Sequence, residues 1–128
     1  MATLIDTNVF VALRNQADAL HKRSLSILES LDQVATTDYV FDELMNVLTR
    51  RRDRRTAREV GSWLMRSEVE MHPVSRDDFY VAWILFIQYP KLSFTDATNI
   101  AVMRSLGIKR IATFDEAFKQ IPGIDVIS

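Results

Sequence analysis

Four acidic residues carry the clearest chemical information in this 128-residue sequence, because each lies in or beside a predicted strand or helix. They are Asp6, Glu43, Asp96 and Asp115. Asp6 follows the apolar residues 2–5 and Asp115 follows residues 109–113, both of which we predict to be strands. The carboxyl ends of parallel strands share one edge of a sheet, where open α/β folds bind ligands. The sequence therefore predicts that the four carboxylates converge at this edge.

Such a cluster of carboxylates is the kind of site that binds a hard divalent cation. Two carboxylates about 5 Å apart repel by on the order of 3 kcal/mol at an effective dielectric near 20, so four of them need a cation or raised pKa values. Ligands that are all oxygen select Mg²⁺ or Mn²⁺ over zinc, which prefers His or Cys. A cation held there can neutralise charge on a phosphate, so we predict a metal-dependent enzyme of phosphodiester chemistry.

Each acid also has a purely structural interpretation. Aspartate is a favoured helix N-cap, and a carboxylate in the first turn complements the helix dipole, which would account for three of the four acids. Glu43 differs, because it lies inside a predicted helix over residues 39–51, at the edge of its apolar face. A carboxylate that borders a buried face needs a partner, and a metal ion is one candidate. The four positions taken together favour the metal site.

Strands and helices alternate along the whole chain. We expect strands at residues 2–5, 34–37, 69–74, 109–113 and 125–127, and helices at residues 7–13, 18–31, 39–51, 54–67, 75–88, 96–106 and 116–120. This alternation predicts an α/β fold, with a parallel central sheet flanked by helices, and the length suits a single domain over residues 1–128. The apolar run at residues 79–87 is too short to span a membrane, so we predict a buried helix there.

Composition narrows the class of protein further. The chain has no cysteine, which excludes a disulfide scaffold and thiolate metal sites and fits a reducing compartment. Asp6 interrupts the first apolar run, so no secretory signal pattern is present. These features predict a cytoplasmic protein with no membrane segment. His21 and His72 are isolated, and no Ser or Cys nucleophile motif accompanies them.

The motifs around the four acids resemble those of the PIN domain. They are Ile5-Asp6-Thr7-Asn8, then Glu43 in the helix after the second strand, then Thr95-Asp96-Ala97, then Thr113-Phe114-Asp115 with Phe118 beyond. Their order and spacing look most like those of the small toxin ribonucleases of bacterial and archaeal VapBC toxin–antitoxin pairs. Each motif is short, but the resemblance covers essentially the whole chain.

The resemblance implies a PIN-like three-layer sandwich and a Mg²⁺- or Mn²⁺-dependent endoribonuclease, the toxin of a toxin–antitoxin pair. The family's acidic positions map onto Asp6, Glu43, Asp96 and Asp115. The first, third and fourth of these would hold the metal, while Glu43 would bind a second metal or orient the attacking water. Polar positions around the same site map onto Thr7, Asn8, Thr113 and Asn99; some relatives carry another acid at the last of these.

The resemblance also implies partners. Members of the family commonly form homodimers and are silenced by an antitoxin tail that lies across the active-site groove. For the RNA substrate, six arginines within residues 50–58 are the best contact candidates, because phosphate contacts dominate nucleic-acid affinity. We single out Arg50, Arg51, Arg54 and Arg55. The alternative is a solvated helix connection, with charges balanced by Asp53 and Glu59.

Four other functions can be compared with the toxin interpretation. PIN domains also occur as RNA-processing nucleases and as catalytically silent RNA- or protein-binding scaffolds, and both remain open for this sequence. An aspartyl phosphatase of the haloacid dehalogenase type is disfavoured, because it usually has Asp-x-Asp after the first strand where this chain has Asp6-Thr7-Asn8. A response-regulator receiver is disfavoured too, since its acidic pair and lysine are not in place.

Overall fold

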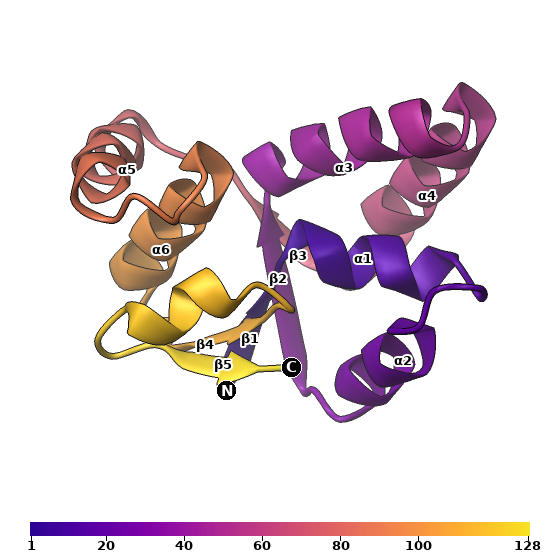
Figure 1. Ribbon diagram of the computed structural model, residues 1–128, viewed down its shortest axis with the longest axis horizontal. Coiled ribbons are helices and arrows are strands. Elements are labelled where there is room, and N and C mark those ends of the chain that lie inside the picture. Colours follow the sequence, from indigo (N-terminus) through magenta and orange to yellow (C-terminus); the bar gives the residue numbers. More distant parts are fainter.

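A five-stranded parallel sheet forms the centre of the computed structural model, which describes residues 1–128 (Figure 1). In spatial order the strands are β3 (Glu70–His72), β2 (Gln33–Thr37), β1 (Ala2–Ile5), β4 (Arg110–Ala112) and β5 (Asp125–Ile127). All four neighbouring pairs are parallel. From β1 the chain adds β2 and β3 on one side, and it later adds β4 and β5 on the other side of β1. The direction in which strands are added therefore reverses between β1 and β4. Such a reversal opens a crevice beyond the carboxyl ends of the strands.

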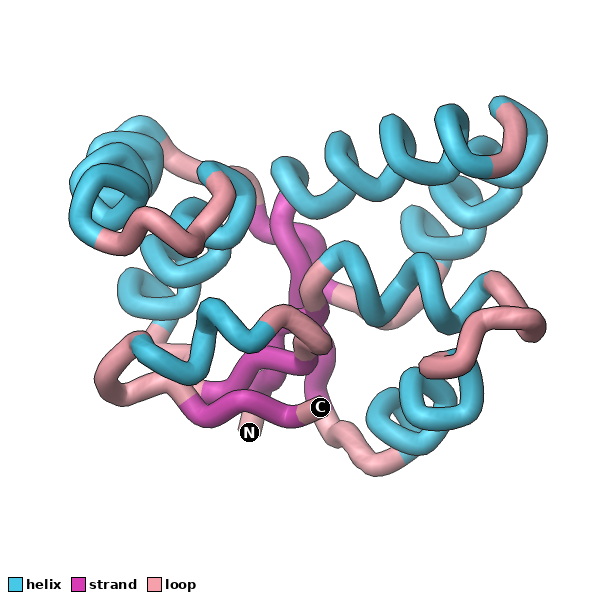
Figure 2. Tube along the Cα trace, in the orientation of Figure 1, coloured by secondary structure: helices cyan, strands magenta, loops and turns pink.

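Helices cover both faces of the sheet (Figures 1 and 2). One face carries α1 (Thr7–Arg14), α2 (His21–Glu29), α3 (Asp38–Arg51) and α4 (Arg54–Arg66). The other carries α5 (Arg76–Gln88), α6 (Phe94–Leu106) and the 3₁₀ helix η1 (Glu116–Gln120). The predicted three-layer α/β sandwich with a parallel central sheet is therefore confirmed.

Two hydrophobic cores lie on the two faces of the sheet, because successive strand residues point in opposite directions. On β1, Leu4 packs with α5, α6 and η1, whereas Ile5 packs with α1 to α4. Both residues are fully buried. On β4, Ile111 and Ala112 divide in the same way. The two central strands are thus buried on both faces, which fixes the positions of the loops at their carboxyl ends.

Several boundaries differ from the sequence prediction for local reasons. The strand expected over residues 69–74 is only three residues long in β3, and the strand expected over 109–113 is shortened to β4. The helix expected from residue 18 begins at His21, because the Asp18 carboxylate accepts the N–H of Leu20 at 2.8 Å and forms a turn instead. The helix expected from residue 96 begins at Phe94, since Ser93 is the N-cap.

The prediction that residues 79–87 form a buried helix is wrong in one respect. The helix exists as α5, but only Ala82 and Leu85 are buried. Most of its large apolar side chains are exposed, including Trp83 at 51% and Ile84 at 63%. The remaining face of α5 packs against α6. None of the helices is both long enough and apolar enough to cross a membrane.

Candidate active site

Asp6 stands at the carboxyl end of β1, next to the point where the strand order reverses. Its backbone N–H donates to the carbonyl of Ala112 at 3.0 Å, which holds the ends of β1 and β4 together. Its carboxylate accepts the N–H of Thr7 at 2.8 Å and begins α1 as the N-cap. Burial away from water raises the pKa of Asp6 from 3.8 to about 6, although hydrogen bonds from Thr113 and Thr7 act in the opposite direction.

A network of polar side chains holds the Asp6 carboxylate in place through hydrogen bonds. The Thr113 hydroxyl donates to it at 2.7 Å, and the side-chain amide of Asn99 donates to it at 3.3 Å. Asn8 in turn donates to the Thr113 hydroxyl at 3.2 Å and accepts the N–H of Phe114 at 3.1 Å. Thr113 also accepts the N–H of Asp115 at 3.1 Å, so β4 and the segment after it are tied to the same carboxylate.

Two buried oxygens beside Asp6 have no hydrogen-bond partner. They are the side-chain carbonyl oxygen of Asn99 and the hydroxyl of Thr7. The orientation of the Asn99 amide is fixed by Asp6. If the amide were flipped, its oxygen would lie 3.3 Å from the Asp6 carboxylate oxygen, and two acceptors would repel each other. Thr7 therefore contacts Asp6 through its backbone rather than through the hydroxyl that we expected to orient the site. An unpaired buried oxygen costs free energy unless something binds it.

Asp96 reaches the site from the first turn of α6. It occupies the third helical position, where its carboxylate accepts the N–H of Ser93 at 3.1 Å while its own N–H donates to the Ser93 hydroxyl at 3.1 Å. This capping box fixes the start of the helix. Burial, and after it the negative charge of Asp6, raise the pKa of Asp96 from 3.8 to about 7. Only 6% of Asp96 is exposed.

One cavity of about 470 Å³ brings the four predicted acids together. Asp6, Glu43, Asp96 and Asp115 all line it. The charges of Glu43 and Asp115 contribute to the raised pKa of Asp6, and the charge of Asp115 contributes to that of Asp96. The acids therefore converge from β1, α3, α6 and the segment after β4 and repel one another, as the sequence predicts.

The four acids fit a hard divalent cation in their chemistry, because carboxylates offer only oxygen, and two buried oxygens beside Asp6 lack partners. The carboxylates nevertheless stand apart. No three Asp, Glu, His or Cys side chains are grouped closely enough to hold a metal ion as they stand. Binding a metal would require side chains such as Glu43 and Asp115, which are only half-buried, to rotate inward.

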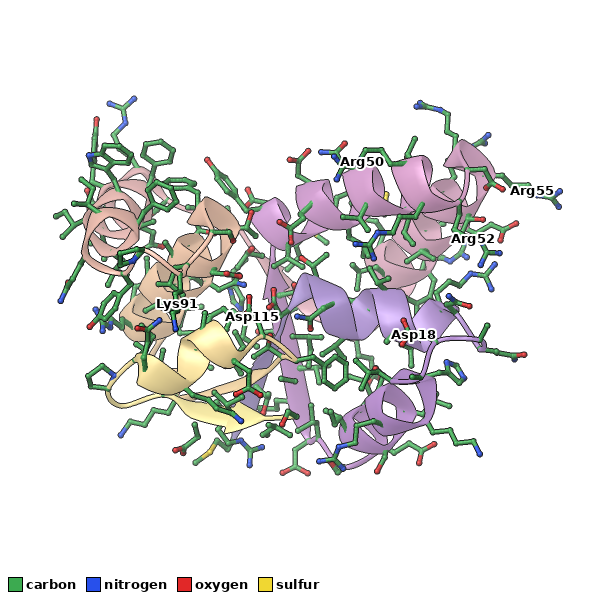
Figure 3. The ribbon with its side chains drawn as sticks, in the orientation of Figure 1. Asp18, Arg50, Arg52, Arg55, Lys91 and Asp115 are labelled. Carbon is green, nitrogen blue, oxygen red and sulfur yellow. The ribbon has the colours of Figure 1, made fainter.

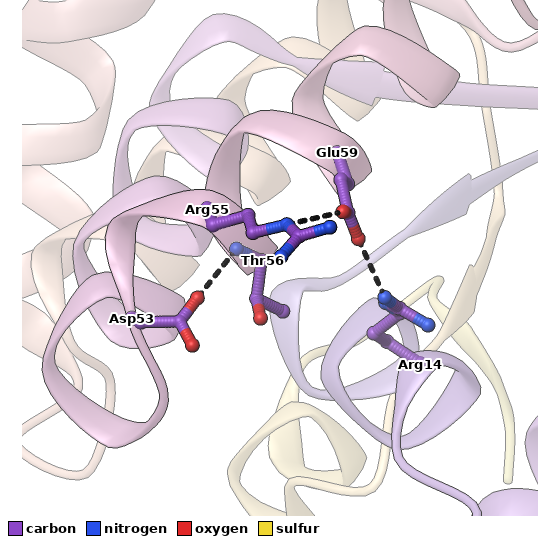
Figure 4. Close-up of polar contacts among 5 residues, drawn as sticks. All are labelled: Arg14, Asp53, Arg55, Thr56 and Glu59. Carbon is purple, nitrogen blue, oxygen red and sulfur yellow. Dashed lines mark hydrogen bonds and ion pairs between the residues drawn. The ribbon is translucent and has the colours of Figure 1, made fainter.

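The run of arginines is divided by the structure into two groups. Arg51 lines the carboxylate cavity, and Arg50 lines a smaller groove beside Glu43. Arg54 and Arg55 lie past the turn, at the start of α4. Figure 4 shows that Arg55 pairs with Glu59 at 3.3 Å, and that Glu59 also binds Arg14 at 2.8 Å. The predicted RNA-contact group is thus not one surface, since only Arg50 and Arg51 lie at the acidic site.

Sequence reasoning missed two charged residues that line the cavity. Asp18, in the loop between α1 and α2, lies at one end, and Lys91, in the loop before α6, lies at the other (Figure 3). Both stand in irregular segments, so no helical or strand periodicity marked them. Lys91 is the only lysine that lines this cavity, and it lies close to Ser93 and Asp96 in the chain.

Comparison with known proteins agrees with this geometry. A family model described as the PIN domain matches residues 3–124. The 23S rRNA-specific endonuclease VapC20 of Mycobacterium tuberculosis is 30% identical over 125 residues, which cover 95% of each chain. The crystal structure of that toxin, described as cleaving the sarcin–ricin loop, superposes with a TM-score of 0.85 over 93% of each chain.

More distant structures share the fold. A toxin–antitoxin complex from Klebsiella pneumoniae has a TM-score of 0.73 at 22% identity and covers 98% of this chain and 96% of its own. FitAcB from Neisseria gonorrhoeae has a TM-score of 0.74 at 17% identity and covers 100% and 97%. The chain therefore belongs to the PIN domain family, among the VapC-like toxin ribonucleases.

Proposed function

We propose that this chain is a Mg²⁺- or Mn²⁺-dependent endoribonuclease, the toxin of a toxin–antitoxin pair, and that it hydrolyses RNA phosphodiester bonds at the four-carboxylate cavity. The observation that carries the proposal is the convergence of Asp6, Glu43, Asp96 and Asp115 on one cavity. The raised pKa values of Asp6 and Asp96 support it, because carboxylates that repel one another in a buried place gain from a cation.

Three of the acids are the proposed metal ligands: Asp6, Asp96 and Asp115. The carbonyl oxygen of Asn99 is an additional neutral donor, since it is buried and has no partner. When bound, the metal supplies positive charge to a phosphate oxygen and lowers the pKa of a water molecule. Thr113 and Asn99 hold the Asp6 carboxylate in place through the hydrogen bonds described above, which is the usual role of residues behind a metal ligand.

The remaining steps belong to the side chains around the acids. Glu43 lies across the cavity on α3 and can accept a proton from the attacking water. The water oxygen bonds to phosphorus in line with the bond that breaks, so one RNA end keeps the phosphate and the other leaves as a hydroxyl. Lys91 lines the cavity near Asp96 and is the basic residue able to bind a neighbouring phosphate.

The relative named as a 23S rRNA-specific endonuclease, which is 30% identical, makes a structured ribosomal RNA loop the first substrate to test. The experiment incubates purified protein with a sarcin–ricin loop oligonucleotide and with a mixed RNA panel, in Mg²⁺, in Mn²⁺ and in chelator. Asp6→Asn is the matched control. Cleavage that needs both the metal and Asp6 supports the proposal and excludes a contaminating nuclease.

The same experiment separates the alternative functions. Metal-dependent cutting of many RNAs without preference would favour an RNA-processing nuclease over a toxin. Absence of cutting with folded protein and with saturable Mn²⁺ binding would favour a silent binding scaffold. Failure to bind Mn²⁺ would overturn the metal site itself.

We also propose two protein partners. The exposed apolar face of α5 is the proposed homodimer surface, because large apolar patches on a protein surface commonly mark interaction sites.

A separate groove lies between α1, α2 and α4. It is the proposed site for an apolar antitoxin segment, and its lining residues are Phe10, Leu13, Leu25, Val60 and Trp63. The similar structure from Klebsiella pneumoniae, named as a toxin–antitoxin complex, shares this fold and makes an antitoxin the partner to test.

A further inference from the structure

The cavity that holds the carboxylates continues past them along α3. Glu43, Val47 and Arg51 line it at intervals of four residues, so a single face of the helix forms this wall. Eight residues of helix correspond to a rise of about 12 Å, which places Arg51 well beyond the carboxylates. The cavity therefore has an acidic end and a second end that the hydrolysis chemistry does not use.

The opposite wall of this second end is apolar and fixed in position. Val11 and Ala12 of α1 line it, together with Leu20 from the loop that follows. The loop is held by a contact of 2.9 Å between the His21 ring nitrogen Nδ1 and the Ala12 carbonyl, and by the turn in which Asp18 accepts the N–H of Leu20. Preformed, largely apolar walls with a few polar groups are typical of small-ligand sites.

Two opposite charges line this end and do not pair with each other. Neither Asp18 nor Arg51 takes part in any of the four ion pairs of the protein. One carboxylate oxygen of Asp18 is used by the Leu20 N–H, and the other makes no hydrogen bond. Arg51 contributes a planar set of donors. The second end thus offers apolar walls, one strong acceptor and one fork of donors.

A guanine base has the matching edge. It carries the acceptors O6 and N7, which bind an arginine fork, and beside them the donors N1–H and N2–H₂, which bind a carboxylate. Adenine would place its amino group against the arginine, and a pyrimidine lacks the N7 acceptor. Bases that project from single-stranded RNA are commonly recognised in this way, with the ring packed against side chains and the edge hydrogen-bonded.

We propose that the second end of the cavity binds the guanine of a nucleotide adjoining the cleaved phosphate. Val11 and Val47 pack against the ring, Arg51 donates to O6 and N7, and Asp18 accepts from N1–H and N2–H₂. The inference rests on the proposed ribonuclease function and adds a base preference to it. It makes Asp18 and Arg51 the residues that determine sequence specificity, whereas the four acids determine cleavage.

The test measures binding of the four nucleoside 5′-monophosphates in Mg²⁺ by titration calorimetry or NMR. Because binding is measured directly, the result does not depend on cleavage. The variants are Asp18→Asn and Arg51→Met. Asparagine keeps the oxygen that accepts the Leu20 N–H, so the turn is preserved. The oxygen proposed to accept from guanine is replaced by an amino group. Arg52→Met is the matched control, because it removes the same charge at the next position and does not line the cavity.

We expect GMP to bind the wild-type protein about 10-fold to 100-fold more tightly than the other three nucleotides, the range expected for one bidentate contact. Asp18→Asn and Arg51→Met should lose this preference, and Arg52→Met should keep it. Equal or undetectable binding of all four nucleotides overturns the proposal. A preference for GMP that survives both variants overturns it as well.

A parallel cleavage assay on an RNA with randomised positions keeps the two proposals distinguishable. Enrichment of guanine at one fixed position next to the cut, lost in Asp18→Asn, supports the base site. Cutting without any base enrichment leaves the ribonuclease proposal standing and rejects the base site. A wild-type protein that cuts nothing yet still prefers GMP rejects the ribonuclease proposal and retains the base site.

Discussion

Replacing Asp96 by Asn should stabilise the metal-free protein. Asparagine has nearly the same shape, and its side-chain oxygen can still accept the Ser93 N–H that closes the capping box. What the change removes is a buried carboxylate whose pKa is raised from 3.8 to about 7, first by burial and then by the charge of Asp6. The ionised form is therefore costly in the folded protein.

The size of the effect follows from the pKa. A rise from 3.8 to about 7 corresponds to about 4 kcal/mol, at about 1.4 kcal/mol for each pH unit. Part of this cost is shared with Asp6, and side chains relax, so we expect a gain of about 2–3 kcal/mol in the free energy of unfolding at pH 8. For a domain of this size that is a rise in Tm of roughly 10 °C.

The cost of ionising Asp96 depends on pH. Below about pH 4 the carboxyl is protonated in both states and costs nothing. Between about pH 4 and pH 7 the unfolded chain ionises while the folded protein retains its proton, so wild-type stability falls as the pH rises. Above about pH 7 the whole penalty is present. The difference between variant and wild type should therefore be near zero at pH 4 and largest at pH 8.

The assay is thermal or urea unfolding of both proteins in chelator at pH values from 4 to 8. Asp32→Asn, at an exposed position between α2 and β2, is the control and should show no comparable trend. A difference between Asp96→Asn and wild type that stays flat with pH would refute the reasoning, as would a variant that is less stable than wild type at pH 8.

Three further predictions concern the metal, the RNA and the assembly. Adding Mn²⁺ at 100 times its dissociation constant should stabilise the wild-type protein by about 2.7 kcal/mol and leave Asp96→Asn nearly unchanged in calorimetry, and equal stabilisation of both would argue against Asp96 as a ligand. In filter binding, Lys91→Met should weaken the affinity for single-stranded RNA and reduce the slope of log affinity against log salt by about 0.7. Lys109 is an exposed lysine away from the cavity, so Lys109→Met should change neither quantity. Ile84→Glu, on the exposed face of α5, should convert a dimer to a monomer in analytical ultracentrifugation while its circular dichroism spectrum stays that of the folded protein. A wild-type protein that is monomeric at all concentrations would reject the dimer.

The parts of the fold that depend on neighbouring residues in the chain could be predicted from the sequence. The five strands and the helices between them follow from apolar periodicity, and the alternation of the two element types is enough to predict a parallel sheet. The position of the cluster follows from topology, since Asp6 and Asp115 come just after adjacent strands. Membership of the PIN domain family, predicted from four short motifs, is confirmed by the comparisons.

The parts that depend on the tertiary arrangement could not be predicted. Apolar residues in α5 indicate a helix that avoids water, but the sequence does not say whether the covering surface belongs to the same chain. Asp18 and Lys91 lie in loops, where no periodic pattern shows which way a side chain points. The arginines at residues 50–58 are adjacent in sequence, yet a tight turn between α3 and α4 sends them to different surfaces.

The capping box at the start of α6 has a consequence for evolution. The same carboxylate of Asp96 that faces the cavity also accepts the N–H of Ser93, so it serves local folding independently of any chemistry. A descendant that abandoned cleavage would still be selected for an acceptor at this position, and Asp or Asn would persist there. Retention of an acid at position 96 is therefore weak evidence of activity in a homologue. Glu43 makes no hydrogen bond of this kind and should diverge first once catalysis is lost.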